Sequence, residues 1–204
     1  MSAISLSEQT VVDAAASAPM LAQVERWAAV NSGSRNLAGL GAIATLLADA
    51  FASLPGTVAL IDPAPVDAVA ADGRIHPLDH GHHLHVCVRP DAPVQLLLTG
   101  HMDTVFAVDD SFQSLRWLEP GVLNGPGVAD MKSGIAIMLA ALNALERSPA
   151  AARIGYDVVI NSDEEVGSPS SAALIARTAQ GKRCLLYTSP SPRDKRQSRM
   201  PSSA

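Results

Sequence analysis

Cysteines and aromatic residues are scarce in this chain of 204 residues, and there is no excess of positive charge. The two cysteines, Cys87 and Cys184, lie far apart and have no metal-type spacing, which argues against a disulfide framework and suits a reducing compartment. Phe, Trp and Tyr make up 3% of the chain and the net charge is -5, so the whole chain lacks the basic field and stacking rings that nucleic-acid binding uses. We therefore expect a small molecule or a peptide as the partner, and no nucleic acid.

Long apolar runs are missing as well. No segment reaches the roughly 18 uninterrupted apolar residues of a membrane-spanning helix, and the N-terminal MSAISLSEQT has no basic region followed by an apolar stretch. Both features predict a cytoplasmic protein that does not bind a membrane. With 48% hydrophobic and 17% charged residues, the chain is typical of one soluble globular domain with a real core.

Four segments have the apolar spacing or the end signals of helices. Apolar residues recur at helical intervals in residues 21–28 and 40–51, and the polar NSGSRN between them (31–36) is predicted to be a loop. Residues 132–146 repeat the helical pattern, with Ala on most of the other faces, which predicts a well-buried helix. A last helix is predicted over 168–180, for which Ser-Pro supplies an N-cap and a first-turn proline.

Strands are predicted between these helices. TVALI (57–61) is the first, followed by a connection rich in Pro, Asp and Ala that extends to about Gly81. HLHVCVR (83–89) and VQLLLTG (94–100) are joined by PDAP and predict a hairpin, and the second is apolar enough to be central. YDVVIN (156–161) is the next strand. Helices that alternate with apolar strands imply a layered α/β sheet.

The last twenty residues, 185–204, change character abruptly. They hold four Lys or Arg against one Asp, show no periodicity and are crowded with Ser and Pro. A basic disordered tail and a nucleic-acid or membrane arm are two interpretations. We prefer a third, because the string resembles translated sequencing-adapter read-through, a non-native segment that is set aside in fold reasoning. We therefore expect a disordered, non-native tail, and a natural protein that continues beyond about Cys184, of which this chain is a fragment.

Three polar clusters lie where predicted strands or loops give way to helices. They are His101 with Asp103, Asp130 just before the helix over 132–146, and the acidic run Asp163-Glu164-Glu165. Ligands on open α/β sheets gather at the carboxyl ends of strands. Imidazole and carboxylates together suit zinc, and one carboxylate can bridge two ions. Asp103 lies on the same side of an extended backbone as His101, so it can fix the tautomer of the ring.

Each cluster has an ordinary structural explanation when it is taken alone. The His-x-Asp sequence is most often a satisfied polar turn, Asp130 is an N-cap candidate, and consecutive acids after a strand usually form a solvated turn. The combination is different, because three separate clusters all supply ligand-type side chains at corresponding places of the predicted fold. Together they predict one site.

The same residues carry a family resemblance. LLLTGHMDTV, NGPGVADMKSGIAIMLAAL and VVINSDEEVGSPSS, in this order and spacing, resemble the dinuclear zinc metallopeptidases and amidohydrolases: glutamate carboxypeptidase, acetylornithine deacetylase, succinyl-diaminopimelate desuccinylase and the aminoacylases. The resemblance covers roughly residues 18–184. It implies a three-layer α/β/α zinc-peptidase-like catalytic domain, of which residues 1–184 would be the N-terminal part, and two zinc ions, with cobalt or manganese as substitutes.

The resemblance also implies a role for each motif residue. His101 would bind one zinc ion, Asp130 would bridge both ions, and Glu165 would bind the other. Glu164 would be the general base, and Asp103 would support the histidine. By the same resemblance, the peptide bond that follows Asp130 is expected to be cis. Two zinc ions about 3.5–4 Å apart acidify a shared water and polarise an amide carbonyl, which leaves a nearby carboxylate to take the proton.

The sequence also departs from this family. Family members carry a further acidic ligand about 25 residues after the position of Glu165 and a last histidine ligand much later. Here the first position falls between Leu185 and Pro192, where there is no carboxylate, and no histidine follows Asp103. The inserted small domain that serves dimerisation and covers the substrate is missing too. We therefore expect a truncated domain with two protein ligands per zinc, which is inactive itself and cannot form the dimer of its parent.

Five further histidines precede the site in sequence: His76, His80, His82, His83 and His85. Because no carboxylate or cysteine motif accompanies them, a histidine-rich hairpin edge is preferred over a second metal site.

The predicted function is metal-dependent hydrolysis of an amide or peptide bond in a small N-acyl amino acid or at a C-terminal residue. The DEEVGSPSS sequence favours the glutamate carboxypeptidase branch. A deacylase of the acetylornithine deacetylase or desuccinylase type and a non-catalytic metal-binding protein remain the alternatives.

Overall fold

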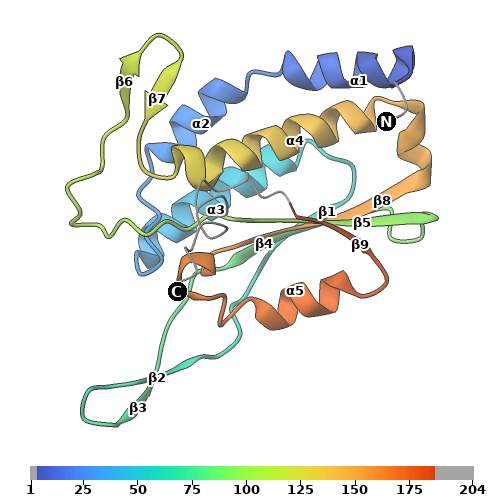
Figure 1. Cartoon of the computed structure of the whole chain (residues 1–204). Helices are drawn as coiled ribbons and strands as arrows, with labels where there is room; N and C mark the ends of the chain where they lie inside the picture. Colours follow the sequence, from blue (N-terminus) through green and yellow to red (C-terminus); the bar gives the residue numbers. More distant parts are fainter. Residues whose placement is uncertain (1–3, 187–204) are drawn as a thin grey trace, which may run out of the picture.

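A computed structural model describes residues 4–186 of the chain. Its centre is a five-stranded mixed sheet with the order β1-β4-β8-β5-β9 (Figure 1). The strands are β1 (Thr57–Ile61), β4 (His83–Val88), β5 (Val94–His101), β8 (Ile154–Asn161) and β9 (Arg183–Leu186). β8 runs parallel to β5 and antiparallel to β4, and β9 is parallel to β5. The predicted strands are confirmed.

Helices cover both faces of the sheet. α1 (Leu6–Ala16), α2 (Met20–Ala28), α3 (Leu37–Phe51) and α4 (Ser133–Glu146) lie on one face, and α5 (Ala172–Ala179) lies on the other (Figure 1). This arrangement confirms the predicted three-layer α/β/α class. The remaining helical segments are short: a π-type segment η1 (Val128–Lys132) before α4, and the 3₁₀ turns η2 (Pro149–Arg153) and η3 (Glu164–Val166).

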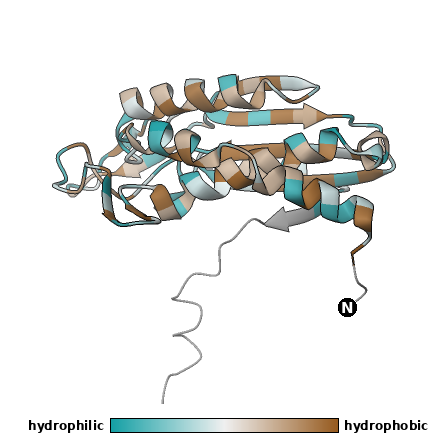
Figure 2. Ribbon diagram, turned by 90° about the horizontal axis from the view of Figure 1, so that it is seen from above, coloured by the Kyte–Doolittle hydropathy of each residue, from teal (hydrophilic) through white to brown (hydrophobic). Residues whose placement is uncertain are grey.

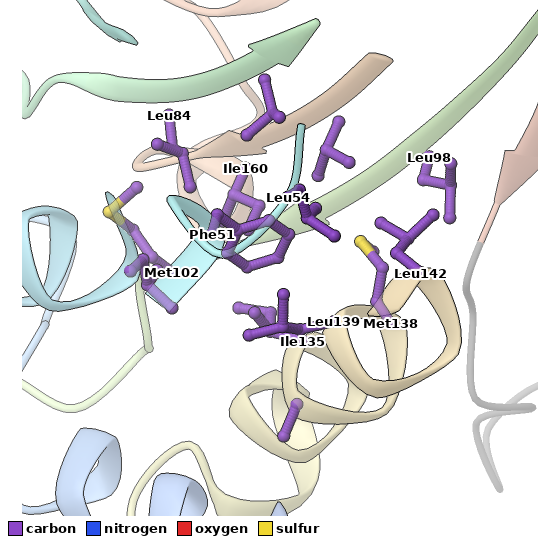
Figure 3. Packing of buried hydrophobic residues seen from close by; sticks show 14 of the residues in the cluster. Phe51, Leu54, Leu84, Leu98, Met102, Ile135, Met138, Leu139, Leu142 and Ile160 are labelled. Atoms are coloured by element: carbon purple, nitrogen blue, oxygen red, sulfur yellow. The ribbon is translucent and has the colours of Figure 1, made fainter. Parts of the chain in front are cut away.

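The main core lies between the sheet and the helices α2, α3 and α4. Phe51 of α3 points into this layer between Ile160 of β8 and Ile135 of α4 (Figure 3). Figure 2 shows hydrophobic residues distributed along both the helices and the strands that enclose the layer. A smaller cluster beneath α5 contains Leu97, Val159 and Leu174. The buried apolar positions of α3 and α4 are those that the helical spacing predicts.

The predicted hairpin between β4 and β5 is wrong, because β8 inserts between them. A turn-rich loop is compatible with a hairpin but does not specify that its two strands pair. The predicted coil up to Gly81 contains a small hairpin instead, β2 (Asp67–Val69) and β3 (Ile75–Pro77), and a second one, β6 (Arg116–Glu119) and β7 (Val122–Asn124), projects from the opposite end in Figure 1. Both hairpins are largely exposed.

The last described helix begins later than predicted. Ser168 is not its N-cap but has a positive φ of 57°, and α5 starts after Ser171. The hydroxyls of Ser170 and Ser171 are engaged elsewhere, as described below. β9 ends at Leu186, and most of the predicted non-native tail, residues 187–204, lies outside the described residues. The boundary predicted at residue 184 therefore stays a prediction.

One helical stretch, Val128–Glu146, is long and apolar enough to cross a membrane by length and composition. It includes α4, which packs against α1, α2 and the sheet. The core helix of a globular protein has the same length and composition, so this stretch is weak evidence for a membrane span.

Candidate metal centre

Strand register brings two of the three sequence motifs together. The last residues of the parallel neighbours β5 and β8, His101 and Asn161, face each other in register. The acidic run that follows β8 turns into η3 directly beyond this edge. Because parallel strands end at the same edge of a sheet, these distant segments of the chain meet there.

Asp130 reaches the same edge from the segment before α4. The backbone departs from helical geometry at Asp130 and Met131 within η1, and the peptide bond between them is cis, as predicted. The side chain of Asp130 is 77% exposed, and its Oδ1 lies 3.0 Å from Nε2 of His101. The carboxylate therefore turns from the start of the helix toward the end of β5.

His101, Asp130 and Glu165 form one cluster. A potential ligand atom from each residue lies within 4.8 Å of those from the other two. His101 is buried, Glu165 is half-buried and Asp130 is exposed, so the cluster opens to solvent on the Asp130 side. Glu164 lies beside it, with Oε2 4.0 Å from His101 Nε2.

Asp103 is buried beneath this cluster and contacts two of its segments. His101 Nδ1 lies 3.1 Å from the backbone oxygen of Asp103 and 3.4 Å from its Oδ1. A proton held on Nδ1 by these acceptors leaves Nε2 free as a ligand. The carboxylate also accepts hydrogen bonds from the backbone N–H groups of Glu164 and Glu165, both at 3.1 Å, and from the Ser34 hydroxyl at 2.7 Å. The contacts to Glu164, Glu165 and Ser34 were not predicted from the sequence.

The cluster carries an excess of negative charge. Burial acts to lower the pKa of His101, but the hydrogen bond to Asp103 and the charges of Asp103, Glu164 and Asp130 outweigh it and raise this pKa to about 9. Burial raises the pKa of Glu165, and the neighbouring carboxylates add to this effect while His101 opposes it. Four carboxylates around one imidazole repel one another, and a cation relieves that repulsion. The donor set therefore fits a divalent metal such as zinc.

A second buried carboxylate, Asp163, anchors the loop that carries Glu164 and Glu165. It accepts hydrogen bonds from the backbone N–H and hydroxyl of Ser170, from those of Ser171, and from the amide of Asn161. Burial acts to raise the pKa of Asp163, but these hydrogen bonds lower it below its usual value. The consecutive serines of the GSPSS sequence thus serve this carboxylate rather than the start of α5.

The loop predicted at residues 31–36 supports the cluster from the other side. The Ser32 hydroxyl donates to the backbone oxygen of Met102 at 2.7 Å, and the N–H of Thr104 donates to the oxygen of Ser32. Lys132 is buried nearby, donates to the oxygen of Val30 at 3.0 Å, and has its pKa lowered by burial to about 8. The sequence carries no signal for this role, because serines are common in exposed loops and only the structure shows that Ser32 and Ser34 are buried.

The five additional histidines do not form a hairpin edge. Four of them lie on or near the interior strand β4, and carboxylates contact two of these, contrary to the prediction. His85 pairs with Asp157 at 2.6 Å and His82 with Asp62 at 3.1 Å. His83 is fully buried and bonds Ser162 and Ser170. Sequence neighbours could not reveal these acids, because β8 and the loop after β1 supply them.

A cavity of about 320 Å³ adjoins the cluster at Glu165. Its walls come from the loop after α2, from the segment that follows Asp103, and from η3. The lining residues are Gly33, Ser34, Arg35, Asn36, Thr104, Val105, Ala107, Val108, Glu165 and Val166.

Comparison with known proteins agrees with this arrangement. Residues 97–196 match the model of peptidase family M20/M25/M40. The chain is 37% identical over 83 residues to succinyl-diaminopimelate desuccinylase 2 of Shewanella loihica (37% of this chain, 21% of the relative), and 36% identical over 85 residues to carboxypeptidase G2 of a Pseudomonas species (42% and 20%). The matched segments thus span about a fifth of these relatives.

Solved structures show the same fold. Human carnosine dipeptidase 1 superposes on 90% of this chain and 41% of its own, with a TM-score of 0.65 and 20% sequence identity. We conclude that residues 97–196 of this chain match peptidase family M20/M25/M40, a family of hydrolytic enzymes.

Proposed function

We propose that the cluster binds zinc and serves the hydrolysis of an amide or peptide bond in a small substrate. The observation that carries this proposal is the meeting of His101, Asp130 and Glu165 from three distant segments, with their potential ligand atoms within 4.8 Å. One imidazole and carboxylates are the ligands of hydrolytic zinc sites. We propose two zinc ions, with Asp130 shared between them, His101 on one and Glu165 on the other; cobalt or manganese would suit the same donors.

Bound zinc would supply a Lewis acid for the amide carbonyl and a water of lowered pKa. We propose Glu164 as the base, which is supported by its side chain being 54% exposed and by the 4.0 Å between its Oε2 and Nε2 of His101. It would take a proton from the attacking water and deliver it to the leaving amine. Asp103 acts through other residues, because it fixes both the ring of His101 and the backbone of Glu164 and Glu165.

For the substrate, we propose a small peptide or an N-acyl amino acid, cleaved in the manner of a carboxypeptidase. The name carboxypeptidase G2 of one relative supports this choice. The desuccinylase name of the other relative, at nearly equal identity, supports deacylation as the second candidate. We further propose that the enzyme works in the cytoplasm, as the free thiol of Cys87 would permit, and that the parent protein is a homodimer.

The test measures zinc stoichiometry and affinity by chelator competition for the wild-type chain and for the variants H101A, D130A and E165A. Two bound zinc ions are expected, and each variant should weaken zinc binding by at least about tenfold. The matched control is E119A, an exposed carboxylate on β6. Absent zinc binding, or equal binding by all variants, would refute the proposal.

Hydrolysis is measured on N-acetyl, N-succinyl and N-benzoyl amino acids by mass spectrometry. Turnover by this chain should be slow at best, because the described residues bring three potential ligands to the cluster. E164Q should keep its zinc and lose about 10²-fold or more of the rate that remains. Zinc binding with no dependence of hydrolysis on Glu164 would favour the non-catalytic metal-binding alternative.

A further inference from the structure

We propose that Arg35 binds a carboxylate of the substrate in the cavity beside Glu165. This inference rests on the proposed function, since it places one end of the substrate next to the metal cluster. It concerns a residue that lies in none of the three motifs.

The position of the cavity supports this assignment. Glu165 belongs both to the metal cluster and to the cavity wall, so a ligand in the cavity lies next to the cluster. A volume of about 320 Å³ has room for a group of amino-acid size. Val105, Val108 and Val166 supply apolar contacts, and Arg35 is the cationic side chain among the lining residues.

His80 orients the guanidinium of Arg35 through one of its nitrogens. Its Nη1 lies 3.2 Å from Nε2 of His80, and Nδ1 of His80 lies 3.0 Å from the backbone oxygen of Leu78. When Nδ1 donates to that oxygen, Nε2 is the acceptor for Arg35. One of the five guanidinium donors is then fixed by the buried His80, and the others remain for a ligand. A planar fork of N–H donors matches a carboxylate in bidentate geometry.

Hydrogen bonds join the two segments that form the walls of the cavity. The Asn31 side-chain amide donates to the backbone oxygens of Phe106 and Ala107, both at 3.2 Å. Gly33 packs so closely on the oxygen of Phe106 that a Cβ there would overlap it. A site held in this way does not have to be ordered by its ligand, which favours binding.

The neighbouring acids weaken the anion site when no metal is bound, so that a higher carboxylate concentration is then needed to occupy it. Asp130, Glu164 and Glu165 would repel a carboxylate when the cluster holds no cation. Metal binding removes that repulsion, whereas Arg35 supplies the direct contact. We favour a carboxylate over a phosphate as the ligand. A phosphate dianion would need more positive charge than the single arginine that lines this cavity supplies.

The experiment uses the full chain loaded with zinc and two probes, N-acetylglycine and N-acetylglycinamide, which differ by a carboxylate in place of a neutral carboxamide of similar shape; calorimetry measures their binding. R35Q should weaken N-acetylglycine about tenfold, the usual loss of a charge-assisted hydrogen bond, and R35K should restore part of it. N-acetylglycinamide should bind all variants alike, and zinc affinity should not change. R177Q, an exposed arginine on α5, is the matched control and should behave as wild type.

Unchanged binding of N-acetylglycine by R35Q, or an equal loss in R177Q, would overturn the assignment. If the wild-type chain does not bind zinc, the proposed function is refuted, but this result does not test the role of Arg35. In that case the Arg35 Nε–H signal in ¹⁵N NMR, followed in the metal-free chain at high N-acetylglycine concentration, decides the issue. The signal should shift with N-acetylglycine and not with N-acetylglycinamide, and its failure to do so would contradict the role of Arg35.

Discussion

The buried carboxylate of Asp103 accepts a hydrogen bond of 3.1 Å from the backbone N–H of Glu165. The same carboxylate lies against the imidazole of His101, so it joins the motif at the end of β5 to the motif after β8. The distance between two proposed metal ligands is thus controlled by a residue that is not itself a ligand.

The variant D103A should weaken zinc binding by about 10–100-fold, since it frees both the ring of His101 and the loop of Glu165. Chelator competition measures the effect. S34A removes one donor to the same carboxylate and should have a smaller effect. Wild-type zinc affinity in D103A would show that the ligands hold their positions without this support.

The variant D163A should lower the free energy of unfolding by at least about 3 kcal/mol, because it leaves several buried donors of Ser170 and Ser171 without an acceptor. Urea denaturation measures this change. D109A replaces an exposed aspartate and should stay within about 0.5 kcal/mol of wild type. Equal stability of the two variants would count against an anchoring role for Asp163.

The buried His83 should make the fold sensitive to mild acid. Burial, together with His80 and His82, lowers its pKa, although Asp163 and the contact to Ser170 oppose this shift. The unfolded chain then binds more protons than the folded chain near pH 6. The contribution of neutral, buried His83 to the free energy of unfolding is therefore fully present above about pH 6.5 and is lost as the pH falls toward the folded pKa.

Urea denaturation at pH 7.5 and pH 5 tests this expectation. H83N should show a smaller loss of stability between the two pH values than wild type, and H76N, at the exposed β3, should show the wild-type loss. An identical pH dependence in H83N would mean that other groups cause it.

Two glycines of α3 should respond oppositely to alanine. A Cβ at Gly39 would overlap the backbone oxygen of Asn31, whereas a Cβ at Gly41 meets nothing within 4 Å. G39A should therefore destabilise the protein by about 1–3 kcal/mol, and G41A should stabilise it by roughly 0.5–1 kcal/mol through helix propensity. Thermal unfolding of the pair provides the comparison, and destabilisation by both variants would contradict the open space at Gly41.

Local patterns predicted the central strands and the core helices, but not which strands pair with each other. The spacing of apolar residues in α3 and α4 follows from the helical period, and polar motifs follow the ends of β5 and β8. β4 pairs with β8, which lies far from it in sequence, and the turn residues after β4 carry no information about such a distant partner. For the same reason the partners of Asp163 and His83 could not be identified, since a buried carboxylate and an exposed one look alike in sequence.

The insertion of β8 between β4 and β5 has a consequence for synthesis on the ribosome. β4 and β5 are synthesised early, but β8, the strand that lies between them, cannot pair with either until residues 154–161 have emerged. Until then both strands present open edges that can pair with other chains. Glu164 and Glu165 follow this late strand and reach His101 with it, so the pairing of β8 and the assembly of the metal centre are one event in time.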